Sequence, residues 1–291
     1  MHPARRGIVY GVLAYGLWGI VPVFWKQLGS VPPLELLGHR VVWGLLTLLA
    51  LSLVSGRWGA LRAAVRDRRV RRSMLVSSVL LTINWGIFVY AVSANRMVDA
   101  SMGYFINPLV SVALGVLALG ERLRRPQQLA LGLAALGVCT LTVQRGAPPY
   151  LALVLAGSFG FYGLVRKTAR VDSLAGTALE TALMTPLALL LLGALAARGG
   201  GALGHAPLRV ELLLLATGVV TTVPLLLFTA AARRLPLTTV GFLQYLAPTG
   251  QLLLAVGVYG EPFDGATLLA FGLIWLGLAV FSLDAWRAVP R

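Results

Sequence analysis

Long apolar stretches, each separated from the next by a short polar segment, dominate the chain. Ten of these stretches are near the length of about 20 residues that a helix needs to cross the hydrocarbon core of a bilayer. They are continuously apolar and lack the alternation of a transmembrane β-strand, so they predict helices. The expected spans are residues 7–28, 35–55, 72–94, 98–120, 127–144, 149–168, 174–197, 210–232, 237–259 and 266–286. The pattern predicts an all-α polytopic membrane protein with ten transmembrane helices.

The composition agrees with this class. Hydrophobic residues make up 58% of the 291 residues, charged residues 12%, and the mean hydropathy is +0.82. A soluble globular chain carries about 25% charged residues, so this chain cannot cover itself with polar surface in water. The single cysteine, Cys139, excludes an intrachain disulfide. No metal-binding or nucleotide-binding motif is present, so we expect neither a metal nor a cofactor.

The formal net charge of +15 indicates an orientation in the membrane. Most of the 25 Lys and Arg residues fall in alternate connecting segments, which places both termini in the cytoplasm by the positive-inside rule. This arrangement explains the basic residues without a nucleic-acid partner. The basic segment 58–72 is interpreted as a solvated loop, or alternatively as a stretch on the inner leaflet with Trp58, Leu61 and Val65 facing lipid.

An internal repeat appears when the chain is shifted by 140 residues. The shift aligns a proline, a Gly-Glu pair and several further glycines in one uninterrupted register: Pro108 with Pro248, Gly120 with Gly260, Glu121 with Glu261, Gly132 with Gly272, and Gly137 with Gly277. We expect one five-helix half at residues 7–144 and a second at 149–286. Because five is an odd number of spans, the second half enters the membrane from the opposite side. Such inverted repeats are typical of secondary transporters with a site near the midplane.

Pro108 and Pro248 fall near the middle of the fourth and ninth runs. Each removes a backbone hydrogen bond to the carbonyl four residues earlier, at Tyr104 and Gln244, so we expect both helices to be interrupted there. Matched breaks in two halves indicate a transport site. The alternative is a pair of kinks that only shape packing.

Polar and aromatic side chains share this depth and must face the bundle interior or a cavity. They predict a central cavity with aromatic walls, suited to a small amphipathic molecule. The candidate substrate-binding residues are Trp18, Asn84, Trp85, Tyr104, Asn107, Tyr162, Thr221, Thr222, Gln244 and Tyr245. Asn84 and Asn107 are the stronger candidates because an unpaired amide is costly in hydrocarbon.

Four titratable residues within or near the spans are candidates for gating or coupling: His39, Arg40, Asp99 and Glu180. Arg40 is interpreted as part of an ion pair or an outer gate, or alternatively as the binder of a substrate carboxylate. Asp99 matches it in depth, whereas Glu180 lies too near the other face for a direct pair. Glu180 is either a proton carrier or a buried hydrogen-bonding group. Glu35 and His39 are four residues apart and can share a helix face.

Several stretches resemble a known family. "HRVVWG" (39–44), "ASMGYFINPLVSVALG" (100–115), "GERLRRPQ" (120–127), "SFGFYGLVRK" (158–167), "VTTVPLLLFTAAA" (220–232) and "GFLQYLAP" (241–248) are similar to RarD-type permeases. These belong to the EamA branch of the drug/metabolite transporter superfamily. The resemblance implies two inverted five-helix EamA units in the inner membrane. It also implies export of amino acids, other metabolites or drugs, without fixing the substrate.

The function expected from these features is an inner-membrane secondary transporter that exports a small amphipathic metabolite or drug by alternating access. Its expected partners are that solute and membrane lipid, and the oligomeric state stays open. The alternative is a non-transporting membrane scaffold or assembly protein. An intramembrane enzyme is not expected, because no complete nucleophile motif is present.

Overall fold

The computed structural model describes residues 3–94, 96–145, 150–260 and 265–287. Within these ranges every regular element is an α-helix. The helices are α1 (Pro3–Lys26), α2 (Pro33–Val54), α3 (Trp58–Arg66), α4 (Arg68–Ser93), α5 (Met97–Leu119), α6 (Arg125–Arg145), α7 (Tyr150–Thr168), α8 (Ser173–Ala197), α9 (Leu208–Ala232), α10 (Leu237–Gln244), α11 (Leu246–Gly257) and α12 (Gly265–Arg287).

Every helix except the short α3 belongs to one of ten membrane crossings. In the part of the chain that the structure describes, nine segments are long and apolar enough to span, and α10 and α11 together form one of them. The tenth crossing is α7, whose last turn carries Arg166 and Lys167. The predicted class, a polytopic all-α membrane protein, is confirmed.

The two halves have the same helix plan. An offset of 140 residues relates the first residues of four helix pairs: Pro33 with Ser173, Arg68 with Leu208, Met97 with Leu237, and Arg125 with Gly265. No insertion separates the halves over these helices, so equivalent positions can be assigned residue by residue. Each half has five crossings, and the two copies therefore have opposite orientations in the membrane.

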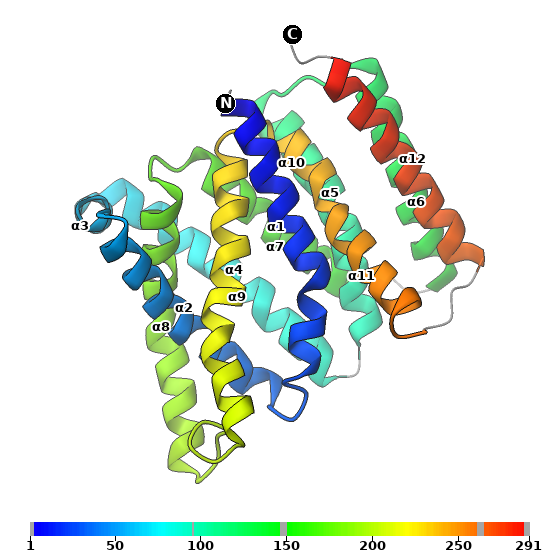
Figure 1. Cartoon of the computed structure of the whole chain (residues 1–291). Helices are drawn as coiled ribbons and strands as arrows, with labels where there is room; N and C mark the ends of the chain where they lie inside the picture. The colour runs from blue at the N-terminus through cyan, green and yellow to red at the C-terminus, as the bar shows by residue number, and fades with distance from the viewer. Residues whose placement is uncertain (1–2, 95, 146–149, 261–264, 288–291) are drawn as a thin grey trace.

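Most helix packing is between the halves rather than within them (Figure 1). Helix α1 packs on α9 as α7 packs on α4, and α1 packs on α11 as α7 packs on α5. Helix α2 likewise packs on α9 as α8 packs on α4. The other main contacts join α2 to α8, α5 to α10, and α6 to α12, and in each of these pairs the two helices are counterparts in the repeat. Exchange of the halves thus reproduces the packing pattern, as expected for an inverted repeat.

The bundle has two faces, which Figure 1 shows at the top and the bottom. The termini face carries the start of α1 at Pro3 and the end of α12 at Arg287. The loop face carries residues 27–32, which join α1 to α2.

Helices α6 and α12 cross closely at two equivalent glycines. A Cβ built on Gly137 would lie 2.6 Å from the carbonyl oxygen of Ala270, and one built on Gly277 would lie 2.8 Å from that of Ala130. Small residues allow such close backbone approach in membranes, where packing replaces the hydrophobic effect as the main attraction between helices.

Gly137→Ala and Gly277→Ala are each expected to destabilise the protein by about 1–3 kcal/mol, because the added methyl group forces α6 and α12 apart. The measurement is the thermal unfolding midpoint of the purified full-length protein in detergent. Gly132→Ala and Gly272→Ala are matched controls on the same two helices, since a Cβ at either meets no atom within 4 Å. Equal effects in all four variants would contradict this account of the crossing.

The predicted helix breaks differ between the two halves. Helix α5 continues through Pro108, so the predicted interruption of the fourth run is wrong. A proline inside a helix removes one backbone hydrogen bond, but the helix can continue past it with a kink. The ninth run is divided at Tyr245, and Pro248 lies in the first turn of α11, where its missing N–H is tolerated.

The basic segment after α2 forms the amphipathic helix α3. Leu61 and Ala64 are buried against α8 and the start of α4. The expectation that Leu61 faces lipid is therefore wrong, as is that of a loop without regular structure.

Candidate functional site

A cavity of about 610 Å³ lies between the two halves. It reaches the surface at the loop face, where Lys26 and Gly29 are exposed. Its walls come from α1, α2, α4 and α5 of the first half and α7, α9, α10 and α11 of the second. The lining includes these predicted residues: Trp18, Arg40, Asn84, Trp85, Tyr104, Asn107, Thr221, Gln244 and Pro248.

Three predicted binding residues lie outside this lining. Tyr162 is fully buried beneath the cavity floor. Thr222 is buried and donates a hydrogen bond to the carbonyl of Gly218 in its own helix, at 2.8 Å. Tyr245 is buried against Ala134 and Ile274, where it packs α10 on the α6–α12 pair. Depth in the membrane was the same for all candidates, but helix rotation turns these three away from the cavity.

Arg40 projects into the cavity among aromatic rings. Its guanidinium carbon lies 4.9 Å from the ring centroid of Trp25 and 4.5 Å from that of Trp85. Its Nε donates a hydrogen bond to Thr221 Oγ1 at 3.1 Å. Among the described residues, no carboxylate forms an ion pair with Arg40, and the side chain of Asp99 lies outside the described residues.

The cavity floor is a cluster of aromatic rings toward the termini face. Trp18 and Phe159 line the cavity with ring centroids 5.9 Å apart. Phe159 packs on Tyr162 at 5.5 Å, and Tyr162 stacks on Phe228 at 5.7 Å. Tyr162 and Phe228 are fully buried, so the cavity ends at these rings.

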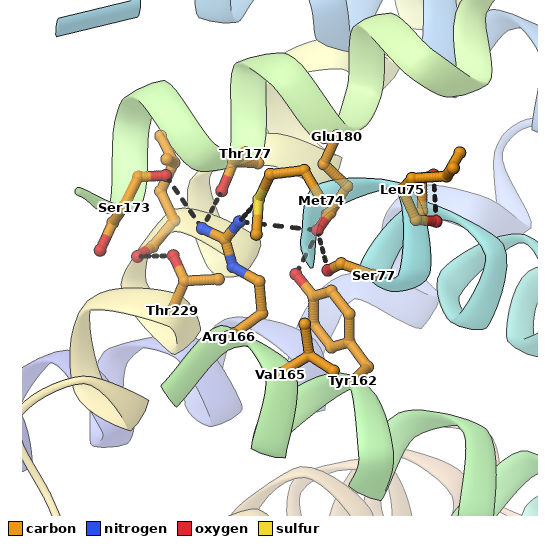
Figure 2. Close-up of polar contacts among 12 residues, drawn as sticks. Met74, Leu75, Ser77, Tyr162, Val165, Arg166, Ser173, Thr177, Glu180 and Thr229 are labelled. Atoms are coloured by element: carbon orange, nitrogen blue, oxygen red, sulfur yellow. Dashed lines mark hydrogen bonds and ion pairs between the residues drawn. The ribbon is translucent and has the colours of Figure 1, made fainter. Parts of the chain in front are cut away.

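Beneath the floor lies an ion pair that joins two helices of the second half (Figure 2). Arg166 of α7 and Glu180 of α8 are 3.6 Å apart, with side chains 1% and 0% exposed. Glu180 accepts hydrogen bonds from Ser77 of α4 and from Tyr162, the latter at 3.2 Å. Arg166 donates to Thr177 Oγ1 at 3.2 Å. Glu180 is therefore part of a packed network that also ties α4 of the first half to the second.

Glu121 ties three helix ends together at the termini face. Its carboxylate accepts hydrogen bonds from the backbone N–H groups of Leu237 and Thr238, at 2.6 and 2.8 Å, and so caps the start of α10. Lys167, at the end of α7, lies 3.9 Å from Glu121 and donates to the carbonyl of Leu235. The repeat equivalent, Glu261, lies outside the described residues.

His39 contributes to a different cluster. It lies 3.5 Å from Glu35, and both side chains are buried away from the cavity lining. Glu35 also accepts a hydrogen bond from the backbone N–H of Ala202 at 2.5 Å, which fixes the loop between α8 and α9 on α2. His39 thus lies in a contact between helix and loop, outside the cavity.

The polar groups of the cavity wall differ in how well they are bonded. Asn84 donates to the carbonyl of Leu155 at 2.9 Å and to Ser158 Oγ at 3.1 Å, joining α4 to α7. Gln244 exchanges hydrogen bonds with Ser111 of α5. Asn107 Oδ1 is buried and has no hydrogen-bond partner among the described residues.

The sequence interpretation missed several residues of the site. Trp25, Lys26 and Phe159 line the cavity, and Arg166 forms the ion pair beneath it. The sequence interpretation treats Lys26 and Arg166, near the ends of spans 7–28 and 149–168, only as cations that set the orientation. Lys26 and Arg166 are 140 residues apart, as are Arg40 and Glu180, and this shared offset is the signal that could have placed them at equivalent positions near the site.

Two stretches of the chain, residues 5–143 and 148–283, each match the profile of the EamA-like transporter family. An uncharacterized transporter of Vibrio cholerae is 46% identical over 98% of this chain and 94% of its own length. Protein RarD of Escherichia coli is 44% identical over 97% of this chain and 95% of its own. Chloramphenicol-sensitive protein RarD of Pseudomonas aeruginosa is 30% identical over 100% of this chain and 98% of its own.

A solved crystal structure has the same fold. It superposes with a TM-score of 0.74 at 24% sequence identity, over 97% of this chain and 99% of that chain. This similarity concerns the arrangement of the helices alone.

Proposed function

Because this chain belongs to the EamA-like transporter family, as a RarD-type permease, we propose that it is a secondary transporter that exports a small amphipathic metabolite or drug by alternating access. The observation that carries the proposal is the cavity of about 610 Å³ between the halves, open at the loop face and ended by aromatic rings at the other. A volume of this size suits a small organic molecule. A non-transporting scaffold has no need of such a cavity.

The charge distribution supports an orientation for this cavity. The protein lies in the inner membrane with its termini face toward the cytoplasm. In this orientation the basic helix α3 and the cations near Arg166 are on the cytoplasmic side. The cavity then opens to the outside, and the floor and the Arg166–Glu180 pair close the cytoplasmic end. This conformation is the outward-facing one.

The inverted repeat supports alternating access. Two halves with the same plan and opposite orientation can exchange conformations, which would open the termini face and close the loop face. That exchange breaks the contacts that close the cytoplasmic end. These contacts are the Arg166–Glu180 ion pair and the hydrogen bonds of Glu121 with α10. Binding of a solute has to supply the free energy difference between the two states.

The test is transport by the purified full-length protein in lipid vesicles. Counterflow of radiolabelled amino acids, nucleobases and phenicol-type antibiotics is expected to exceed that of protein-free vesicles for at least one compound. Reporter tags at both termini are expected on the cytoplasmic side. No counterflow of any compound, or termini on opposite sides, would overturn the proposal.

A further inference from the structure

The repeat assigns equivalent positions to two pairs of charged residues. Arg40 is the eighth residue of α2 and Glu180 the eighth residue of α8, its counterpart. Lys26 of α1 lies 140 residues before Arg166 of α7, so these two cations are equivalent as well. One half of the protein therefore places a cation and an anion where the other places two cations.

In the second half, the pair closes the termini face of the bundle. Arg166 and Glu180 are 3.6 Å apart, and almost no solvent reaches either side chain. Figure 2 shows the two side chains directed toward each other, with Ser77 and Tyr162 completing the hydrogen bonds of the carboxylate. A cation at this depth is held because an anion neutralises it.

In the first half, the equivalent cations line the cavity. Arg40 and Lys26 both belong to its wall, and none of the described residues of that wall is acidic. Lys26 Nζ lies 3.5 Å above the ring of Tyr259. The structure gives the terminal Nη atoms of Arg40 no hydrogen-bond or ion-pair partner among the described residues. Two like charges cannot pair with each other, and the described residues of this wall supply no carboxylate in the role of Glu180.

Building on the proposed function, we infer that a carboxylate of the transported solute supplies in the first half the negative charge that Glu180 supplies in the second. The carboxylate binds between Arg40 and Lys26, and a guanidinium can hold it through two N–H donors. The rest of the cavity wall is largely apolar and aromatic, with Trp85, Phe88 and Phe159 among its members. The substrate class is therefore a small organic acid with an apolar or aromatic body, bound as its anion.

This assignment also gives the solute a part in closing the cavity. When the carboxylate binds, it offsets one of the two positive charges of Arg40 and Lys26, and the loop face gains the kind of charge pair that closes the termini face. The empty cavity leaves two positive charges in its wall, and their mutual repulsion opposes closure. An anionic solute thus stabilises the closed loop face more than a neutral solute of the same shape.

The experiment compares three probes that share a phenyl body and differ in charge: phenylacetate, phenylacetamide and 2-phenylethylammonium. Binding to the purified full-length protein in lipid nanodiscs is measured by titration calorimetry and by thermal shift. Phenylacetate is expected to bind at least tenfold more tightly than either of the others. Arg40→Gln is expected to remove this preference, because it removes the positive charge and the paired N–H donors of the guanidinium.

Two further variants keep the test decisive. Arg198→Gln removes an exposed cation at the same face, outside the cavity, and is expected to retain the tenfold preference. Arg40→Glu reverses the charge and is expected to favour 2-phenylethylammonium. Phenylacetate binding no tighter than phenylacetamide in the wild type, or an unchanged preference in folded Arg40→Gln protein, would overturn the anion site.

The two proposals fail in different assays. If vesicles show counterflow of neutral or cationic solutes but the protein has no preference for phenylacetate, the anion site is wrong and transport stands. If phenylacetate binds through Arg40 but no compound is transported, the anion site stands and the transport function is wrong.

Discussion

Glu180→Gln is expected to lower the free energy of unfolding by about 3–5 kcal/mol, the usual cost of removing one partner from a buried ion pair. The variant leaves Arg166 without an anion at a position where its side chain is only 1% exposed. The measurement is unfolding of the purified protein in detergent, followed by thermal midpoint and by denaturant titration. Replacing both partners, as Arg166→Leu with Glu180→Leu, is expected to recover part of the loss because no uncompensated charge remains.

Arg57→Gln is the matched control for this pair. Arg57 lies 3.7 Å from Asp172, but the two side chains are 59% and 31% exposed, so the loss is expected to stay below about 1 kcal/mol. Glu180→Gln protein with wild-type stability would show that the ion pair is not structural. If such protein also transports without dependence on a pH gradient, Glu180 is a proton carrier instead.

Asn107→Ala is expected to reduce counterflow by at least tenfold while the unfolding midpoint stays within a degree or so of the wild type. The reason is that Asn107 lines the cavity and its Oδ1 has no partner among the described residues, so its hydrogen bond is left for the solute. A buried polar group that is unpaired in the free protein and bonded in the complex favours binding. Counterflow is measured with whichever compound the vesicle screen identifies.

Asn84→Ala provides the contrasting result. Its amide already bonds the backbone of Leu155 and the hydroxyl of Ser158, so its loss is expected to destabilise the contact between α4 and α7 by about 1 kcal/mol. The structure thus separates two asparagines that the sequence treats alike. Wild-type counterflow in Asn107→Ala protein would remove this residue from the binding site.

The sequence predicted the membrane class, the ten crossings and the repeat because these depend on runs of apolar residues and on one constant offset. Most of the predicted binding residues line the cavity, since depth alone places residues such as Trp85 and Asn107 near the midplane. The rotation of each helix about its axis was not predictable. The prediction therefore included Tyr162 and Thr222, which lie outside the cavity.

The partner of Glu180 escaped prediction for a related reason. Arg166 follows an apolar run and satisfies the positive-inside rule, so nothing in its sequence context distinguishes it from a solvated cation. A long arginine side chain can extend from a helix end into the bundle, and only the packing of α4, α7 and α8 shows that it does. The division of the ninth run at Tyr245 is likewise a matter of packing, because the matching Pro108 leaves α5 unbroken.

The packing of helices across the repeat has a consequence for biogenesis. Helix α6 finds its main partner in α12, which the ribosome delivers last, and α1 and α2 pack mainly on helices of the second half. Helix α6 must therefore stay in the lipid without its main neighbour until synthesis is nearly complete, whereas α4 and α5 gain theirs as soon as α7 follows. A nascent chain released before α12 has no finished subdomain to protect it, so quality-control proteases can recognise it as incomplete.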